Sequence, residues 1–241
     1  MAQGGLWPPR GRARDTPRRP GLSCSASPFR SPPSPPFFPL AMLRLARLAA
    51  VLAASAIGAA APDQTAARDL EVAAAVKAAQ ERLRGWRRPS DDDLRRRGVS
   101  ELSLLVTGQD DTEPAFRNAY FDKKEAGVYL DVISGEPLYS SADKYDSRSG
   151  WPSFTRALPG VDLGTGTDFK IGYARTEMRS PIADSHLGHI FPDGPKDRGG
   201  MRHCVNSASL RFVPVAEMEA EGLSDLRGAL FPEWAGSKDE L

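Results

Sequence analysis

Cys204 and three histidines make up the richest concentration of reactive side chains in the sequence. His186, His189 and His203 are the only histidines of the chain, and all lie within 18 residues of Cys204. A free thiol is only a few per cent thiolate at neutral pH. If this segment is a strand, Arg202 shares a face with Cys204, so we expect its guanidinium to favour the thiolate. A nearby histidine supplies a proton donor near neutral pH.

Three interpretations of this segment are open on residue types alone. A thiol nucleophile assisted by histidine acid–base chemistry fits best. The His-x-x-His pair together with Cys204 offers three metal ligands and one open position, as in a catalytic zinc centre. The third interpretation is a buried structural cysteine in a strand, with histidines at the surface.

Strands are the elements that must position these residues. The runs 128–133 and 210–213 are rich in β-branched and aromatic residues, and glycine and proline turns are frequent between them. We therefore expect a mainly β fold. It should be a compact domain of antiparallel β-sheets with peripheral short helices on the N-terminal side.

Helices are predicted at three places. From Asp63 to Trp86, apolar residues recur at helical spacing; they are Leu70, Ala73, Val76, Ala79 and Leu83. Ser90 precedes three aspartates, which is typical of the N-cap and acidic first turn of a short helix. After residue 110, a helical period returns only in 215–223.

The two ends of the chain carry targeting signals. Residues 1–41 hold 10 of the 21 prolines and are expected to be a disordered leader, or a gene-model extension ahead of a start at Met42. Residues 42–61 have the positive start, apolar centre and small final residues of a signal peptide. Lys238-Asp239-Glu240-Leu241 is the retention signal of the endoplasmic reticulum. We expect residence in the lumen of that organelle; a bipartite leader directing the protein to another organelle is the alternative.

Between these signals we expect a helical segment at 62–88, a folded domain at 89–233 and a tail at 234–241. Residues 62–241 contain 24 basic and 30 acidic residues, and this net negative charge argues against a nucleic acid partner. The 2 cysteines exclude a disulfide framework and a zinc site of four cysteines. No apolar run reaches the roughly 20 residues that span a bilayer.

Three motifs resemble the B-type methionine sulfoxide reductases, which reduce the R epimer of methionine sulfoxide in proteins. They are Ser-Arg-Ser-Gly-Trp-Pro-Ser-Phe at 147–154, Asp-Ser-His-Leu-Gly-His-Ile-Phe-Pro-Asp-Gly at 184–194, and Arg-His-Cys-Val-Asn-Ser-Ala-Ser-Leu-Arg-Phe at 202–212. Supporting matches lie at 108–116, 127–129 and 134–138. The likeness runs from about Pro89 to Phe231, and three motifs in the same order are far more specific than one.

The resemblance implies a mechanism. Cys204 is the expected nucleophile, which attacks the sulfoxide sulfur and is left as a sulfenic acid when methionine departs. His189 is the candidate acid that protonates the sulfoxide oxygen, and His186 would orient or polarise the substrate. Arg202 and Asp193 would tune the charge around the thiol and the histidine.

Three further residues are expected to contact the substrate. Trp151 would receive the methyl group of the substrate on its indole face, and Phe191 and Asn206 would complete the surround of the site. Two simpler alternatives stay open: Trp151 as a core residue and Asp193 as a turn former.

The chain departs from the family in its metal ligands. Many members bind a structural zinc through two Cys-x-x-Cys pairs. The corresponding positions here hold no cysteine; they are Asp131, Ser134, Ser180 and Ala183. Zinc is therefore not expected, nor is any tightly bound cofactor.

The second departure concerns turnover. Members often carry a resolving cysteine where this chain has Ser149, and serine cannot form a disulfide with Cys204. Cys24 lies in the leader and is expected to be absent from the mature protein. The sulfenic acid would then need an external reductant, a thioredoxin-like protein or a small thiol.

We therefore expect a monomer that repairs oxidised methionine in the secretory pathway. Oxidised proteins are its expected substrates, and the retention receptor of the endoplasmic reticulum is an expected partner. Two alternatives remain. One is a reductase of free methionine sulfoxide or of another sulfoxide, and the other is a non-catalytic module that binds oxidised methionine.

Overall fold

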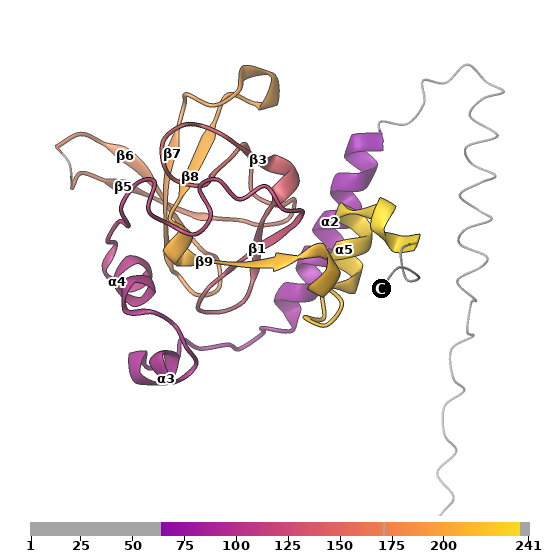
Figure 1. The fold of residues 1–241 in the computed structure, drawn as a ribbon, viewed down its shortest axis with the longest axis horizontal. Coiled ribbons are helices and arrows are strands. Elements are labelled where there is room, and N and C mark those ends of the chain that lie inside the picture. Colours follow the sequence, from indigo (N-terminus) through magenta and orange to yellow (C-terminus); the bar gives the residue numbers. More distant parts are fainter. Residues whose placement is uncertain (1–63, 171, 237–241) are drawn as a thin grey trace, which may run out of the picture. The chain divides into compact units, whose positions relative to one another are not determined.

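Two antiparallel sheets form the centre of the fold (Figure 1). The computed structural model describes residues 64–170 and 172–236, so the leader, the signal peptide and the retention signal lie outside the described residues. The first sheet has the order β2-β1-β9, with bounds Pro137–Ser140, Gly127–Asp131 and Leu210–Pro214. The second has the order β3-β4-β8-β7-β6-β5, with bounds Lys144–Tyr145, Ser153–Phe154, Arg202–Val205, His186–Phe191, Arg175–Arg179 and Gly164–Asp168. Neighbouring strands are antiparallel, which confirms the predicted mainly β fold.

The first sheet is covered on both faces. Along β1, Val128 and Leu130 belong to one core and Tyr129 to the other, as the pleat of a strand requires. The core around Val128 includes helices α2 (Gln64–Glu81) and α5 (Ser224–Leu230), which lie side by side although they stand at opposite ends of the described chain (Figure 1). The core around Tyr129 joins the two sheets. The segment predicted as helical at 62–88 thus shares a core with the strands.

Helix α2 corrects the predicted helix in two respects. It ends at Glu81, before the predicted end at Trp86, where the chain turns toward Gly85 with a φ of +75°. Its buried residues are Val72, Ala75, Val76 and Ala79. Leu70, which was assigned to the apolar face, is 73% exposed. Two residues correspond to about 200° around a helix, so Leu70 lies opposite Val72.

The helix predicted at 215–223 is wrong in position. The chain forms a single 3₁₀ turn, η4 (Val215–Glu217), then turns at Gly222 with a φ of +72° before α5 begins at Ser224. Val215, Met218 and Leu223 are nevertheless buried together. Their spacing carries the apolar pattern of a helix, but the glycine ends the run before a helix can form.

The capping signal at Ser90 is confirmed. Its Oγ accepts a hydrogen bond from the N–H of Asp93 at 3.2 Å, and α3 spans Asp91–Arg96. Helix α4 (Glu101–Gln109) follows and ends at Asp110, whose φ of +55° turns the chain toward the second sheet. The other short 3₁₀ helices are η1 (Ser141–Asp143), η2 (Lys196–Arg198), η3 (Ser207–Ser209) and η5 (Pro232–Gly236). Among the described helices, none is long and apolar enough to cross a membrane.

Two loops, 131–136 and 180–185, occupy the place where the family resemblance would put zinc ligands. Glu136 is fully buried and ties them together: its Oε1 accepts hydrogen bonds from the N–H groups of Ile182 (2.9 Å) and Ala183 (3.0 Å). The side chain of Asp131 is likewise used within its own loop, where it accepts two N–H groups at 2.8 Å. These residues supply no thiolate and do not fit a four-cysteine zinc site.

Replacing Glu136 with alanine is expected to lower the free energy of unfolding by about 2–5 kcal/mol, because two buried N–H groups lose their acceptor. Glu136→Gln keeps a carbonyl oxygen there and should cost less than about 1 kcal/mol. Burial raises the pKa of Glu136. The contribution of Glu136 to stability should therefore fall as the pH rises from the ordinary carboxyl pKa through the raised one, so the wild-type protein should lose more stability over this range than the Gln variant. Urea unfolding across this pH range measures both effects; an alanine variant as stable as the wild type would contradict the assignment.

Candidate active site

Cys204 lies in the middle of the second sheet. On β8 it pairs with Ser153 of β4 on one side and with His189 of β7 on the other. Side chains directly opposite each other on antiparallel strands share a face, with Cβ atoms about 4.5–5.5 Å apart. Backbone pairing therefore places the thiol beside the imidazole of His189.

An irregularity in β7 brings His186 and His189 to one face. Residues three apart on a regular strand point to opposite faces. Here the register between β6 and β7 shifts, so that an extra residue of β7 opposes β6, and the two imidazole rings lie 5.4 Å apart. Gly188, between them, has a φ of +149°, and a Cβ there would lie 2.1 Å from the carbonyl oxygen of Cys204. Only glycine fits this position.

Cys204 lines a small pocket of about 90 Å³. The thiol residue is half-buried. The pocket brings together most of the site residues predicted from the sequence: Cys204, His189, Trp151, Asn206 and Phe191. The structure adds Thr112, Arg175, Gly188 and Val205 to this lining. The thiol, one imidazole and the indole therefore share a single opening.

Trp151 is oriented by a hydrogen bond from its indole Nε1 to the backbone oxygen of Glu113 (3.0 Å). Glu113 is buried, and its carboxylate accepts the N–H groups of Ser207 and Ala208, which follow β8. Burial raises the pKa of Glu113, and these two N–H groups oppose the rise. Glu113 thus fixes its loop against the end of β8 and holds the indole at the pocket.

Both polar atoms of the Asn206 side-chain amide form hydrogen bonds with backbone groups. Its Nδ2 donates to the carbonyl oxygen of Leu187 (3.2 Å), and its Oδ1 accepts from the N–H of Glu113 (3.2 Å). It joins β7, β8 and the Glu113 loop at the rim of the pocket. The side chain shapes the site through these contacts.

His189 is held by Asp168 of β5. Its Nε2 lies 2.7 Å from Oδ2 of Asp168, which also pairs with Arg175. The backbone N–H of Lys170, together with these two side chains, lowers the pKa of Asp168 to about 2 against the opposing effect of burial. The ionised carboxylate accepts the hydrogen of Nε2 and leaves the lone pair of the neutral ring on Nδ1.

The acid role predicted for His189 needs revision. Burial lowers the pKa of His189; the bond to Asp168 opposes this, and the positive charge of Arg175 adds to it. The imidazole is therefore neutral at neutral pH. It can donate a proton to a substrate only after it has first accepted one.

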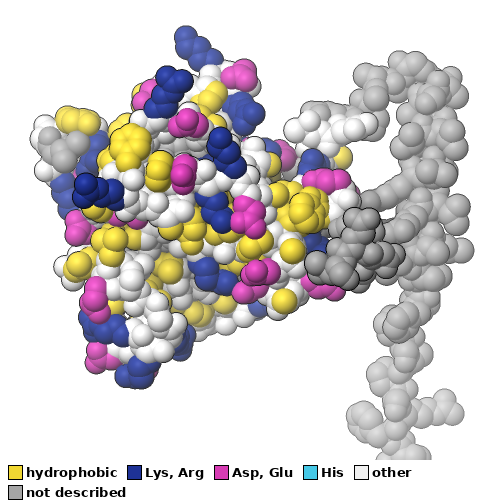
Figure 2. Space-filling model, in the orientation of Figure 1, with side chains coloured by type: hydrophobic (Ala, Val, Ile, Leu, Met, Phe, Trp, Pro, Cys, Tyr) yellow, Lys and Arg dark blue, Asp and Glu magenta, His cyan; other side chains and the backbone are white. Residues whose placement is uncertain are grey.

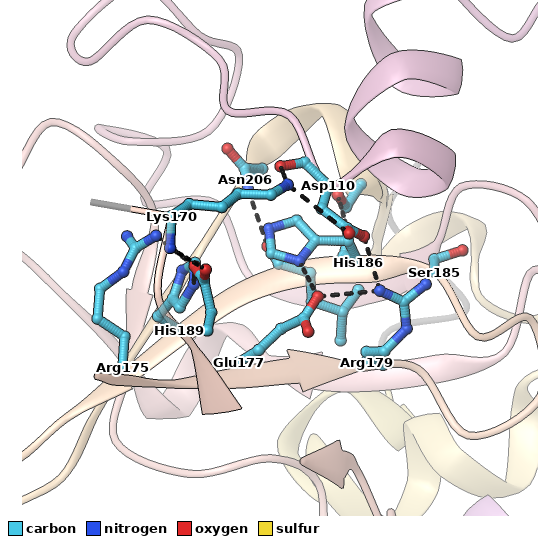
Figure 3. A network of polar contacts seen from close by, with 12 residues as sticks. Asp110, Lys170, Arg175, Glu177, Arg179, Ser185, His186, His189 and Asn206 are labelled. Carbon is cyan, nitrogen blue, oxygen red and sulfur yellow. Dashed lines mark hydrogen bonds and ion pairs between the residues drawn. The ribbon is translucent and has the colours of Figure 1, made fainter. Parts of the chain in front are cut away.

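The structure does not bring His186 into the pocket. This side chain is 2% exposed and lies behind, in the polar network of Figure 3. Its Nδ1 is 2.6 Å from Oε1 of Glu177. Arg179 donates to the same oxygen (2.9 Å) and to Oδ1 of Asp110 (2.7 Å), which ties the end of α4 to β6. His186 braces the strand that carries His189 and has no direct path to a substrate.

Asp110, Glu177 and His186 also have the spacing of a metal site, with ligand atoms within 4.8 Å of one another. The guanidinium of Arg179 bonds to both carboxylates and balances their charge, so a cation would have to displace it. A zinc centre on the two histidines and the thiol is also disfavoured, because each imidazole is already held by its own carboxylate.

Arg202 forms a double hydrogen bond with Asp193 (2.8 and 2.9 Å) and stacks over the ring of Phe191, with 4.5 Å from Cζ to the ring centroid. Burial raises the pKa of the Cys204 thiol, and Arg202 lowers it by a smaller amount. Arg202 thus favours the thiolate, as the sequence predicted, but its effect is smaller than that of burial. The thiol therefore keeps its proton at neutral pH, because burial raises its pKa by more than Arg202 lowers it.

Comparison with known proteins agrees with this geometry. Residues 99–214 match the SelR domain, and this range contains every residue that lines the pocket. Residues 99–214 belong to the SelR family. This membership confirms the resemblance to the B-type methionine sulfoxide reductases that the three motifs carry.

A curated relative points the same way. The peptide methionine sulfoxide reductase MsrA/MsrB of Vibrio cholerae serotype O1 is 49% identical over 149 residues, which are 62% of this chain and 39% of that protein. The chain thus spans about two fifths of the length of this relative.

Ser149 of this SelR domain lies next to the thiol. Its Oγ is 4.0 Å from Sγ of Cys204. A chain of hydroxyl groups continues from Ser149 to Ser147 (2.8 Å) and on to Ser153 (2.7 Å). The position at which the family resemblance would put a resolving cysteine therefore adjoins the Cys204 thiol.

Several residues of the SelR site were missed from the sequence. Asp168 and Arg175 are direct partners across the β5–β6 hairpin, and Glu177 opposes His189 on β6. The signal that could have found them is the Arg-Thr-Glu alternation at 175–177, which puts two charges on one face of a strand. Glu113 lay within a motif match but was assigned no role.

Proposed function

We propose that this SelR domain reduces methionine-R-sulfoxide in proteins, with Cys204 as the nucleophile. The observation that carries the proposal is the pocket shared by the thiol, His189 and Trp151. Family membership supports methionine sulfoxide reduction as the reaction class. The pocket of about 90 Å³ is far smaller than the roughly 300–1,000 Å³ of sites for small-molecule ligands. Its size suits the end of a side chain and not a tightly bound organic cofactor.

The route of proton transfer follows from the protonation states of Cys204 and His189. Cys204 begins as a thiol and His189 as a neutral imidazole with its lone pair on Nδ1. His189 accepts the thiol proton as Sγ attacks the sulfoxide sulfur, and the negative charge of Asp168 stabilises the imidazolium. The imidazolium then gives this proton to the sulfoxide oxygen.

The reaction balances without an added proton. The S–O bond of the substrate breaks, the two electrons that reduce its sulfur come from Cys204, and the oxygen ends on that residue as a sulfenic acid. Methionine leaves. A thiol and a sulfoxide have become a sulfenic acid and a thioether.

The pocket also gives a reason for selection of one epimer. The sulfoxide sulfur carries a methyl group, an oxygen and the rest of the side chain. The face of Trp151 receives the methyl group, His189 must face the oxygen, and the peptide must leave through the mouth of the pocket. Only one arrangement about the sulfur meets these three demands.

The proposal is tested with methionine sulfoxide peptides of either configuration, with dithiothreitol as reductant. The purified protein should reduce only the R form, and Cys204→Ser should lower turnover by at least about a thousandfold. Ser224→Ala, at an exposed serine at the start of α5 and outside the pocket lining, is the matched control and should keep most of the activity. Binding without turnover, turnover of the S form, or activity that survives in Cys204→Ser would each overturn the proposal.

Recycling needs a reductant from outside the domain. Cys204 is the free cysteine of the described residues, and Ser149 offers no second thiol beside it. A thioredoxin-like protein or a small thiol therefore reduces the sulfenic acid of the monomer in two thiol steps. No zinc takes part, and elemental analysis of the purified protein should show no stoichiometric metal.

The cellular setting rests on the sequence signals. The signal peptide at 42–61 and the retention signal at 238–241 support residence in the lumen of the endoplasmic reticulum, where a retention receptor would bind the tail. Oxidised proteins of the secretory pathway are the proposed substrates. Basic and acidic side chains are interspersed on the face shown in Figure 2, which does not suit nucleic acid. Mass spectrometry of the native N-terminus tests the predicted cleavage.

A further inference from the structure

A second, larger pocket adjoins the thiol pocket. It has a volume of about 520 Å³, and Trp151 lines both pockets. Phe116 and Phe121 form part of its wall, with their rings edge to face at 5.9 Å. Phe116 is 57% exposed, so the aromatic wall faces solvent. A chain that enters the thiol pocket over Trp151 therefore passes directly beside this groove.

The charge of the groove is opposite to that of the rest of the folded body. Its lining has four basic and two acidic side chains: Lys123, Lys124, Lys144 and Arg148, against Asp122 and Asp146. Two of the cations are engaged, because Lys123 pairs with Glu125 (2.7 Å) and Lys144 donates to the carbonyl oxygen of Phe121 (3.0 Å). Lys124 and Arg148 make no ion pair with any described residue, and their charges are available to a ligand.

The backbone of the groove is strained at two places. Four described residues other than glycine have left-handed φ angles; two are aspartates, which tolerate this region, and the others are Phe116 (+59°) and Arg148 (+58°). Both of these line the groove. Phe116 is kept in this conformation by its N–H, which donates to the carbonyl oxygen of Gly150 (2.9 Å). Strain of this kind persists where a site needs a side chain in a set position.

We propose that this groove binds the stretch of substrate polypeptide next to the oxidised methionine, and that Lys124 and Arg148 select an acidic side chain there. The inference rests on the proposed function and adds a substrate preference to it. One or two extended residues span about 3.5–7 Å, so a neighbour of the methionine stays close to Trp151, where the two pockets meet. The aromatic wall contacts the peptide, and the two cations attract its carboxylate.

The test uses the full chain, dithiothreitol and two R-sulfoxide peptides that differ only in glutamate or glutamine residues beside the methionine sulfoxide. The wild-type protein should show kcat/KM about fivefold higher for the acidic peptide, mainly through KM. Lys124→Gln/Arg148→Gln should abolish this ratio while kcat/KM for the neutral peptide stays within about twofold. Raising the salt concentration should also reduce the ratio, because exposed charges are screened. Lys77→Gln, at an exposed lysine of α2, is the matched control and should keep the preference.

The outcomes separate this inference from the proposed function. A wild-type protein that reduces both peptides equally, or a double variant that keeps the preference, overturns the groove assignment while the reductase activity stands. A protein that reduces neither peptide overturns the proposed function itself. A macromolecular reductant is absent from the assay, so a lost preference in the double variant reports contact with the substrate.

Discussion

His189→Gln is expected to slow the reduction of an R-sulfoxide peptide by about 10²–10⁴-fold. Glutamine can still donate a hydrogen bond to Asp168, but it cannot take the thiol proton and pass it to the sulfoxide oxygen. The measurement is methionine formed in a single turnover without reductant, which isolates this step from recycling. The variant should still unfold at nearly the wild-type urea concentration.

The pH dependence of methionine formation in a single turnover should identify His189 as the group that transfers the proton. Burial lowers the pKa of His189. The neutral imidazole is the active form, so the wild-type rate should be level near neutral pH and should fall only below the ordinary histidine pKa, as the ring becomes protonated. His189→Gln should lack this fall. Its residual rate should rise with pH, because only spontaneous ionisation of the thiol remains, and burial raises the pKa of Cys204.

Variants at two neighbours of His189 should shift the fall in rate at low pH in opposite directions. Asp168 raises the pKa of His189, so Asp168→Asn should shift the fall in rate to lower pH. Arg175 lowers that pKa, so Arg175→Gln should shift it to higher pH. Proton transfer through His189 would be contradicted if the wild-type rate began to fall above the ordinary histidine pKa. It would also be contradicted if both variants shifted this fall in the same direction.

The fold could be predicted where local pattern and tertiary packing agree. Ser90 and its aspartates specify a cap by local hydrogen bonds, and the apolar run at 128–133 specifies a buried strand. The helix face of α2 was misassigned at Leu70, because alanine-rich helices have several faces of similar apolarity. The face that is buried is chosen by α5, far away in the sequence. The failure at 215–223 has a local cause: the spacing is apolar and helical, but the chain turns at Gly222, where φ is +72°.

The candidate active site could likewise be predicted only in part from the sequence. Cys204, His189 and Trp151 could be named because reactive residue types and motifs stand out in a sequence. The register shift that turns His186 onto the face of His189 depends on pairing with β6, which no local pattern encodes. The protonation states were also beyond the sequence. Arg202 lowers the pKa of the Cys204 thiol, as its place in the sequence suggested, but burial raises that pKa by more.

Ser149→Cys is expected to change how the domain is recycled. Ser149 Oγ lies 4.0 Å from Sγ of Cys204, so a small rotation of two side chains would bring two sulfurs to the roughly 2.05 Å of a disulfide. After one turnover without reductant, wild-type Cys204 should remain a sulfenic acid that reacts with dimedone. In the variant, the introduced thiol should attack this sulfenic acid, form an intramolecular disulfide and release water. Dimedone labelling should fall at least about tenfold, and thioredoxin should then support turnover more efficiently than it does in the wild type.

Ser224→Cys is the matched control, because Ser224 is exposed at the start of α5, outside the pocket lining. It adds a thiol without bringing it to Cys204 and should leave dimedone labelling unchanged in dilute protein. Full labelling in Ser149→Cys would mean that position 149 cannot reach the sulfenic acid. Loss of labelling in both variants would point to exchange between molecules instead. A disulfide confined to Ser149→Cys would show that the wild-type domain depends on an external thiol because of one side chain beside the nucleophile.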